Sequence, residues 1–430
     1  MRLSHARGAV SVRFDDPNLV SCAGLAPVLA LAARCGLTTL LAERVRITAK
    51  GGANAAAKIL ALVAGMVAGA DSISDMGLLR HGGMGRLFHD VRAPSTLGTF
   101  LRVFTFGHVR QLDAVAARLL ARLARATPIL AGADQVAFLD IDDTVKVTYG
   151  YAKQGSGRGY SGVNGINALL ATLSTPIAAP VIAATRLRQG ATNSVRGAAT
   201  LLADALACAR RAGAGGLLVM RADSAFYTHA IIATCRRAGA RFSITARHTP
   251  TVTSAIARIG EPDWTPIHYP HAIWDDEEQR WVSDAEVAET AFTAFTGRRH
   301  GEHITARLIV RRVRRLNPAT TPGQSEMFAV YRYHAVFTDS PEPMIDAEAT
   351  HRDHAIIEQV IADLKDSALA HLPSGRFTAN AAWLVGAAIA HNLTRAAGAL
   401  ASAFHARART ATIRTQLINT PAGSHAPPTA

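Results

Sequence analysis

The sequence predicts an α/β fold that is preceded by an all-helical domain and interrupted by an antiparallel β-rich insertion. Three observations support this prediction. Apolar residues recur at helical spacing up to about residue 130, and strand-like apolar runs alternate with helical patterns between 131 and 250. Between 251 and 345, aromatic and β-branched residues cluster instead. At 430 residues with 49% hydrophobic content, the chain can form two or three domains with a sizeable core.

The chain is strongly basic. It has 46 Lys and Arg against 32 Asp and Glu, a formal net charge of +14, and a sequence pI of about 10.3. This balance favours a polyanionic partner, and nucleic acid is the usual one. An anionic membrane surface is the competing interpretation, but no basic amphipathic helix stands out. A generally Arg-rich proteome is the plain alternative.

The cysteines indicate a reducing compartment. They are Cys22, Cys35, Cys208 and Cys235. None forms a CxxC pair, so the spacing favours neither a zinc ribbon nor a disulfide framework. The sequence starts without a signal-peptide pattern, and a cytoplasmic location is expected. Residues 159–185 carry no charge, but Pro176 and Pro180 favour two buried strands around a turn over a membrane-spanning helix.

Residues 1–130 predict a helical DNA-binding domain. Apolar faces recur in "GLAPVLALAARCGL", "NAAAKILALVAGMVAG" and "QLDAVAARLLARLARA", with Gly or polar breaks between them. Arginines crowd the last of these helices. A plain helical bundle with a solvated basic face is an equally good interpretation.

Residues 131–250 predict the first part of the α/β core. Strands are expected over "QVAFLDI", "INALLATLS" and "APVIAATRL". A helix then covers "RGAATLLADALACARRAG", and a β-α-β unit follows over "GLLVMRA", "FYTHAIIATCRRAG" and "RFSITA". The order is therefore three strands in sequence and then β-α-β.

Residues 251–345 predict the antiparallel insertion. Its strands carry Arg307, Arg311, Arg312, Arg314 and Arg315, and Trp264, Trp274 and Trp281 lie upstream. Alternating arginines on strands can bind phosphates, and aromatic rings can stack on bases. A solvated strand face with packing tryptophans is the alternative.

Residues 346–405 predict a return to helix, as the last helices of the core. "HAIIEQVIADLKDSALAHL" has an apolar face, and "ANAAWLVGAAIAHNLTRAAGALASAF" is apolar enough to be buried against the sheet. Residues 406–430 are expected to form a basic and then disordered tail, because its end is rich in Pro, Ser and Ala.

The stretch "FLDIDDTVKV" places three carboxylates at the end of a strand: Asp140, Asp142 and Asp143. Side chains alternate along a strand, so Asp140 and Asp142 share a face and Asp143 lies opposite. Clustered carboxylates repel one another unless a cation is present, and a divalent ion with oxygen ligands fits them. An exposed acidic loop is the alternative.

Two further acids belong to the same argument. Asp223 follows the strand "LLVMRA", at the edge where α/β proteins bind ligands, although a helix cap is the simpler interpretation. Glu358 lies in a helix, with Lys365 seven residues later on the same face. His351 and His354 precede Glu358 on nearly that face, but no recognised zinc spacing is present.

The motif "DIDDTV" resembles the start of haloacid-dehalogenase-type phosphatases, which would make Asp140 the nucleophile. The resemblance covers only residues 140–145. The paired acidic motif expected after a further strand is missing, since Asp223 has no second acid nearby. A phosphatase is therefore kept as a minor alternative.

A larger resemblance covers nearly the whole chain, to DDE transposases of bacterial insertion sequences and closest to the thirteen-eighty group. "FDDPNLVSCAGLAPVLALAARCGL" is similar to the opening of that group, and "LDIDDT", "RADSAF" and "HRDHAIIEQVIADLK" resemble its three catalytic motifs. The resemblance assigns the catalytic roles to Asp142, Asp223 and Glu358. The separations are 81 residues (142 to 223) and 135 residues (223 to 358).

This resemblance implies an RNase H-like core in which the three acids hold two Mg²⁺ ions, for which Mn²⁺ can substitute, with Asp140 as an additional candidate ligand. It also implies strand cleavage at the transposon end, transfer of the 3′-OH to target DNA, and a homodimer joining two ends. The expected protein is bacterial, cytoplasmic and nucleoid-associated, with no membrane partner. The DNA-binding candidates are Lys365, Arg352, His351, His354, Arg311, Arg312, Arg314 and Arg315.

The chain departs from the family pattern at two places. His351 and His354 stand where relatives commonly have Tyr and Arg, and Arg352 is a candidate for the missing positive charge. The chain also stops at a Pro-rich tail. A truncated, catalytically impaired transposase that only binds DNA is therefore the main alternative function.

Overall fold

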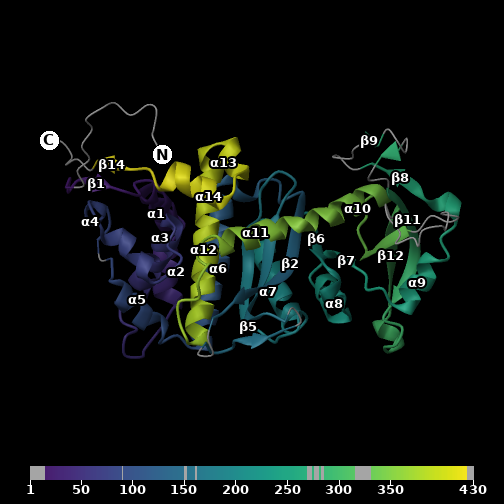
Figure 1. The fold of residues 1–430 in the computed structure, drawn as a ribbon, viewed down its shortest axis with the longest axis horizontal. Coiled ribbons are helices and arrows are strands. Elements are labelled where there is room, and N and C mark those ends of the chain that lie inside the picture. Colours follow the sequence, from purple (N-terminus) through teal and green to yellow (C-terminus); the bar gives the residue numbers. More distant parts are fainter. Residues whose placement is uncertain are drawn as a thin grey trace, which may run out of the picture. The chain divides into compact units, whose positions relative to one another are not determined.

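The computed structural model of the chain describes residues 15–89, 91–149, 153–159, 162–268, 274–275, 280–281, 285–314 and 331–423. For 274, 275, 280, 281 and 314 it describes the backbone alone. The chain divides into two compact units, one formed by Met1–Val115 with Leu364–Ala430 and the other by Ala116–Asp363. We call them unit 1 and unit 2. The mixed α/β class predicted from the sequence is confirmed (Figure 1).

Unit 1 is mainly helical and combines segments from both ends of the chain. Its main helices are α1 (Leu25–Arg34), α2 (Leu37–Arg44), α3 (Ala55–Ala68), α4 (Met84–Leu87), α5 (Pro94–Leu101), the start of α6 (Phe106–Ala126), α12 (Phe377–Ala401), α13 (Ala403–Arg407) and α14 (Thr410–Ile413). Helix α12 contacts α1, α3, α5 and α14. Its buried residues lie on almost every face of the helix, so other helices must pack around it.

The sequence placed α12 with the last helices of the core, but the structure groups it with the N-terminal helices. The expected disordered tail is also ordered as far as Gly423. Strand β14 (Ala422–Gly423) pairs antiparallel with β1 (Leu19–Val20). Gly24 packs so closely on this tail that a Cβ atom would lie 1.8 Å from the carbonyl oxygen of Leu417, so only glycine fits there.

Unit 2 contains a ten-stranded mixed sheet. Its strands are β2 (Val136–Val147), β3 (Gly157–Arg158), β4 (Asn164–Ser174), β5 (Val181–Gln189), β6 (Leu217–Ala222), β7 (Arg241–Thr245), β8 (Thr265–Ile267), β11 (Ala285–Ala294), β12 (Ile304–Arg314) and β13 (Tyr331–Thr338). The order is β3-β4-β2-β6-β7-β13-β12-β11-β8, with β5 also paired to β4. Strands β2, β4 and β5 run antiparallel, whereas β2, β6 and β7 run parallel.

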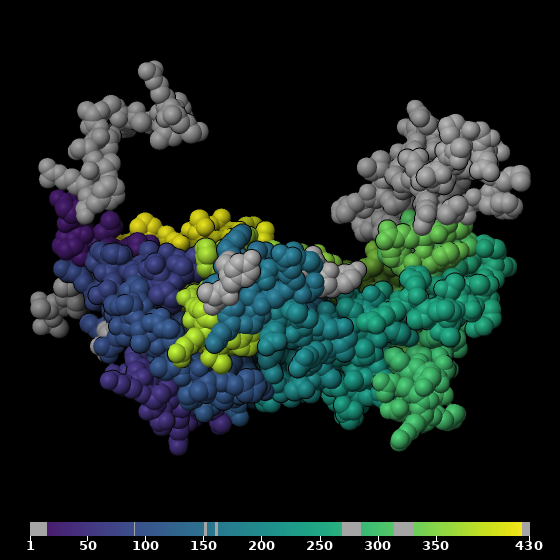
Figure 2. All heavy atoms as spheres, turned by 60° about the horizontal axis from the view of Figure 1, so that its bottom comes forward, coloured from purple at the N-terminus to yellow at the C-terminus, as the bar shows by residue number. Residues whose placement is uncertain are grey.

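The β-rich insertion extends the same sheet instead of forming a separate body. Strand β13 pairs antiparallel with β7, and β12, β11 and β8 follow in antiparallel order. The teal and green segments of unit 2 accordingly form one continuous surface (Figure 2). A short pair, β9 (Trp274–Asp275) and β10 (Arg280–Trp281), lies apart from this sheet.

Helices pack on both halves of the sheet in unit 2. Helix α7 (Ala198–Arg211) contacts β5, β4, β2 and α8 (His229–Arg237), and α9 (Pro250–Ile256) follows β7 in the chain. Helix α10 (Met344–Arg352) contacts β11 and β12 and leads through the 3₁₀ turn Asp353–Ala355 into α11 (Ile356–Lys365). Within the described ranges no single helix is long and apolar enough to cross a membrane; α1 and α2, bent by 57°, pass such a test only as a pair.

Candidate functional site

Two of the predicted acids lie side by side where the parallel pairing of β2 with β6 ends. The register of β2 and β6 ends with Ile141 opposite Ala222, so Asp142 and Asp223 are the next residues of the two strands. Asp142 stays in the sheet, because β2 continues against β4. Asp223 leaves the strand, and its carboxylate accepts the backbone N–H of Ala225 at 2.9 Å. The sheet and a tight turn therefore hold the two carboxylates at the same edge.

The surroundings of Asp142 favour its protonated form. Its pKa is raised to about 7, mainly by desolvation and in smaller part by the charges of Asp223, Asp143 and Glu358. The backbone N–H of Asp143 donates to the Asp142 carboxylate at 2.7 Å and opposes the shift. Glu358 on α11 and Asp223 therefore both lie within electrostatic range of Asp142.

Asp223 has a raised pKa as well. Desolvation is again the main cause, the hydrogen bond from Ala225 opposes it, and the Asp143 charge adds to it. His354, which follows α10, lowers this pKa. The charges of His354 and Glu358, on the segment from α10 to α11, thus act on Asp223 and Asp142, respectively.

These carboxylates have the chemistry that a divalent cation requires. In the described structure, Asp142, Asp223 and Glu358 form no ion pair with Lys or Arg, and their oxygens are hard ligands suited to Mg²⁺. Among the residues with described positions, however, no three His, Cys, Asp or Glu side chains converge closely enough to hold a metal ion. The three acids therefore fit the cation by charge and donor type, whereas binding would require them to draw closer.

Asp140 has a different role from the one predicted. Its two carboxylate oxygens accept Nε and Nη2 of Arg221 at 2.7 and 2.8 Å, and both side chains are almost fully buried. Arg221 also donates Nη1 to the carbonyl of Thr350 at 2.7 Å and lies over the Phe138 ring. Because both oxygens already have a partner, the structure favours a buried ion pair as the role of Asp140 over that of an additional metal ligand or a phosphatase nucleophile.

Asp143 belongs to a polar network on β4 and β5. Its carboxylate pairs with Arg188 and accepts the Asn167 amide at 2.6 Å and the Ser194 hydroxyl at 3.2 Å. Arg188 also donates to the carbonyl of Ser194 at 2.7 Å. The three aspartates of "FLDIDDT" therefore have three environments. Asp140 is in a buried ion pair, Asp142 has no cationic partner in the described structure, and Asp143 is in a hydrogen-bonded network.

His351 is part of the protein interior. Only 5% of it is exposed, and its Nδ1 and Nε2 lie 3.0 Å from the hydroxyls of Ser243 and Thr245 on β7. Desolvation lowers its pKa to about 3, with smaller effects from His354 and Arg221. This burial leaves His351 little surface for a DNA contact. Its neighbour His354 stacks on it and donates Nδ1–H to its carbonyl at 2.8 Å.

The arginines of the insertion are largely neutralised. Arg312 donates to Glu286 at 2.6 Å and to both oxygens of Glu261 at 2.8 and 2.7 Å, and it lies between the rings of Trp264 and Tyr331. The predicted DNA contact of Arg312 conflicts with this burial, and the buried Trp264 offers no free face for a base.

Glu348 on α10 neutralises two more predicted DNA-binding residues. It pairs with Arg311 at 3.3 Å and with Arg352 at 2.9 Å. The side chains of Arg314, Trp274 and Trp281 and the whole of Arg315 lie outside the described residues. Lys365 is the exposed last residue of α11 and is counted with unit 1.

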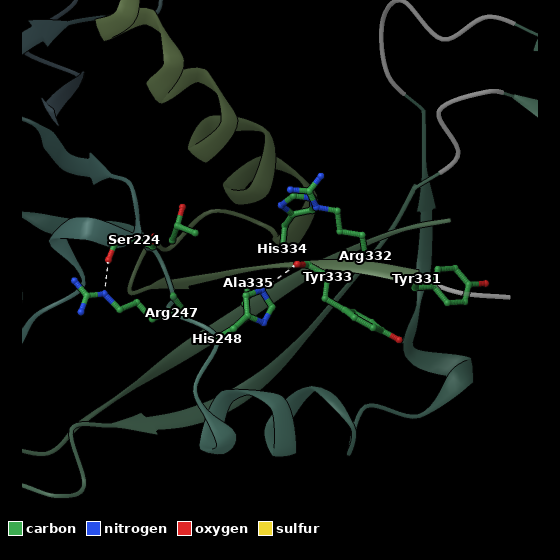
Figure 3. A pocket seen from close by; sticks show the side chains of 10 residues that line it. Ser224, Arg247, His248, Tyr331, Arg332, Tyr333, His334 and Ala335 are labelled. Carbon is green, nitrogen blue, oxygen red and sulfur yellow. Dashed lines mark hydrogen bonds between the residues drawn. The ribbon is translucent and has the colours of Figure 1, made fainter. Parts of the chain in front are cut away.

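A polar cavity of about 540 Å³ lies next to the Asp223 turn. It is lined by Ser224, Thr245, Ala246, Arg247, His248, Tyr331, Arg332, Tyr333, His334 and Ala335 (Figure 3). The sequence analysis missed this site. The alternation of aromatic and basic residues in "YRYH" was its only signal, and strand alternation alone does not show that the two segments meet.

Comparison with known families gives a match over nearly the whole chain. The family described as transposase DDE domain group 1 matches residues 4–423, which is almost the entire chain. No curated protein matches the chain.

Proposed function

This chain belongs to the transposases of DDE domain group 1, and on that premise we propose that it moves a bacterial insertion sequence of the thirteen-eighty group. It binds the terminal inverted repeats, cleaves a DNA strand at the element's end and joins the 3′-OH to target DNA. The observation that supports this proposal is the edge of β2 and β6. There Asp142 and Asp223 are register neighbours without a cationic partner in the described structure, and Glu358 raises the pKa of Asp142.

Asp142, Asp223 and Glu358 are the proposed metal ligands. When bound, two Mg²⁺ or Mn²⁺ ions would supply Lewis-acid activation of the attacking oxygen and stabilise charge on the leaving oxygen. The protein holds each ligand in a different way: Asp142 by the sheet, Asp223 by the turn that its carboxylate caps, and Glu358 by α11.

The buried ion pair of Asp140 and Arg221 supports this arrangement. It connects β2 with β6, and Arg221 reaches the carbonyl of Thr350 on α10. His351 connects the end of α10 to Ser243 and Thr245 on β7. These buried contacts orient the segment that leads into α11, and thereby Glu358, relative to the two aspartates.

We propose that β5-β4-β2-β6-β7 with α7 is the RNase H-like core. Three sequential antiparallel strands are followed by two parallel ones, in the order expected from the sequence. Strands β13, β12, β11 and β8 are then the insertion that separates Asp223 from Glu358. The helices before residue 130 are proposed to bind DNA, and the active form to be a homodimer.

Lys365, Arg352 and His354 remain proposed DNA contacts, as do Arg314 and Arg315, whose side chains are not described. His351, Arg311 and Arg312 are left out, because their side chains are largely buried. Arg352 is kept, because 32% of its side chain is exposed despite its ion pair with Glu348. The net charge of +14 supports a phosphate-rich partner.

The test is cleavage of a labelled duplex that carries the element's own end, in Mn²⁺. We expect Asp142→Asn to lower the cleavage rate by roughly 10³-fold or more while DNA binding persists. Asp346→Asn is the matched control, because Asp346 is an exposed carboxylate on α10 outside the site. Wild-type cleavage that survives in Asp142→Asn would overturn the assignment of the site.

A DNA-binding protein without cleavage activity is the second candidate. The observation in its favour is that the acids do not converge closely enough to hold a metal in the described structure. Wild-type protein that binds the element's end in Mn²⁺ but never cuts it would establish this alternative. Neither binding nor cutting would remove both candidates.

A further inference from the structure

The cavity beside the Asp223 turn forms where β7 ends and β13 continues. Thr245 opposite Val336 is the last register pair of these strands. Beyond it, the N–H of Ala246 still donates to the carbonyl of Ala335 at 2.8 Å, and the residues that follow on the two segments line the cavity. Ser224, the residue after Asp223, forms part of its wall, so the cavity adjoins the proposed active site.

The described lining is cationic and includes no acidic residue. It has two arginines and two histidines among its ten residues. Arg247 donates Nε to the carbonyl of Ser224 at 2.8 Å and Nη2 to that of Ala225 at 3.0 Å, so its guanidinium is fixed against the Asp223 turn. Arg332 is exposed and makes no ion pair with any described residue.

The pKa of His334 reflects the same excess of positive charge. Desolvation lowers the pKa of His334, and the charges of Arg311, Arg332 and His248 lower it further. His248 is fixed, because its Nε2–H donates to the carbonyl of Tyr333 at 3.1 Å. Arg332 and His334 lie together on one side of β13, and Tyr333 and His248 lie on the other (Figure 3).

This excess contrasts with the rest of the insertion. Arg307 pairs with Glu289 at 2.6 Å, Arg311 pairs with Glu348 at 3.3 Å, and Arg312 has two glutamate partners. The described part of the fold therefore supplies carboxylates to the strand arginines but none to the lining of the cavity. A recess whose described lining is cationic and has no carboxylate is suited to an anionic ligand.

We propose that this cavity binds a backbone phosphate of the DNA strand next to the bond cleaved at the proposed active site, with Arg247 and Arg332 as its cations. The proposal rests on the proposed function. A cavity of about 540 Å³ admits one phosphate with its sugar, and a guanidinium is the side chain best shaped to bind phosphate oxygens. DNA is favoured over a free anion because Ser224 joins the cavity wall directly to Asp223.

The experiment measures binding of a short fluorescein-labelled duplex in EDTA, which prevents cleavage, over a series of NaCl concentrations. Each phosphate contact contributes about 0.9 to the slope of log K against log salt. We expect Arg332→Gln and Arg247→Gln each to make this slope shallower by about one unit. Arg332→Lys should keep the wild-type slope, because it keeps the charge.

Arg258→Gln is the matched control, since Arg258 is exposed in unit 2 but does not line the cavity. It should leave the slope unchanged. Arg332→Gln is the decisive variant, because Arg332 has no structural partner in the described chain whose loss would disturb folding. A wild-type slope in both Arg332→Gln and Arg247→Gln, or an equal loss in Arg258→Gln, would overturn the proposal.

Mn²⁺-dependent cleavage of the element's end, measured in parallel, separates this proposal from the proposed function. Wild-type protein that cuts DNA, with unchanged slopes in the cavity variants, would remove the phosphate site and leave the transposase. Shallower slopes in the cavity variants of a protein that never cuts would support phosphate binding in the cavity and remove the cleavage activity.

Discussion

Two aspartates, Asp142 within β2 and Asp223 after β6, are as prominent in the sequence as the arginines of β12. The fold gives the arginines charged partners but gives the aspartates none in the described structure. Arg311 and Arg312 each lie against glutamates, and Arg312 is buried between two aromatic rings. Asp142 and Asp223 have no cationic side chain against them in the described structure, and desolvation raises the pKa of both.

The difference shows which charges support structure and which are available to a ligand. A buried charge with its partner stabilises the arrangement around it only as long as both members remain. A carboxylate held without a partner destabilises the protein on its own, and a bound cation can relieve that cost. The same reasoning separates the paired arginines of β12 from Arg332 of β13, which has no ion-pair partner among the described residues.

The largest expected effect comes from breaking the ion pair of Asp140 and Arg221. Asp140→Asn leaves a buried guanidinium without its counter-charge, and we expect the free energy of unfolding to fall by about 3–5 kcal/mol. Urea unfolding followed by circular dichroism measures this loss of unfolding free energy. A loss below about 1 kcal/mol would show that water reaches the ion pair of Asp140 and Arg221, so that the pair does not stabilise the site as a buried contact.

The double variant Asp140→Leu with Arg221→Met is the control for this experiment. It replaces both charges by apolar side chains, so it should recover part of the lost stability. Cleavage should remain impaired, because the hydrogen bond from Arg221 to Thr350 would be absent. Full cleavage activity in a stable double variant would show that the pair does not position Glu358.

A smaller effect is expected from Arg312→Ala. The change removes a buried side chain that packs on Trp264 and leaves Glu286 and Glu261 unpaired, so unfolding should become easier by about 2–3 kcal/mol. Arg332→Ala is the matched comparison, because the Arg332 side chain is exposed. This variant should lower the free energy of unfolding by less than about 0.5 kcal/mol. Thermal unfolding of both variants tests the distinction, and equal losses would contradict it.

The smallest effect concerns the pH dependence of Asp142. Its pKa is about 7 in the folded protein against an ordinary 3.8, so the contribution of Asp142 to stability is fully present below pH 3.8 and is lost as the pH rises through 7. Asp142→Asn removes this loss. At pH 8 without metal we expect the variant to be more stable by about 1–2 kcal/mol, less than the full shift implies because the carboxylate is partly hydrated.

Denaturant unfolding at pH 5 and pH 8 checks this sign. The advantage of Asp142→Asn should shrink at pH 5, and Mg²⁺ should raise the stability of the wild type more than that of the variant. A variant that is less stable than wild type at pH 8 without metal would mean that the Asp142 carboxylate is already stabilised by the protein.

The sequence determined the fold class, the family resemblance and the strand ends that carry the acids. These features follow from local periodicity and from motif order, which a single chain displays directly. Alternation along β2 also separated Asp140 from Asp143, and the structure places their carboxylates on different partners, Arg221 and Arg188. The catalytic roles of Asp142, Asp223 and Glu358 remain predictions.

Only the tertiary structure decided which charged residues are free. Asp140 meets Arg221 from 81 residues away, and Arg312 meets Glu261 from 51 residues away. His351 meets Ser243 from 108 residues away. Such partners are brought together by strand order and helix packing, and no local pattern encodes them. For the same reason the sequence placed α12 in the core and missed the cavity, because both depend on which distant segments pack together.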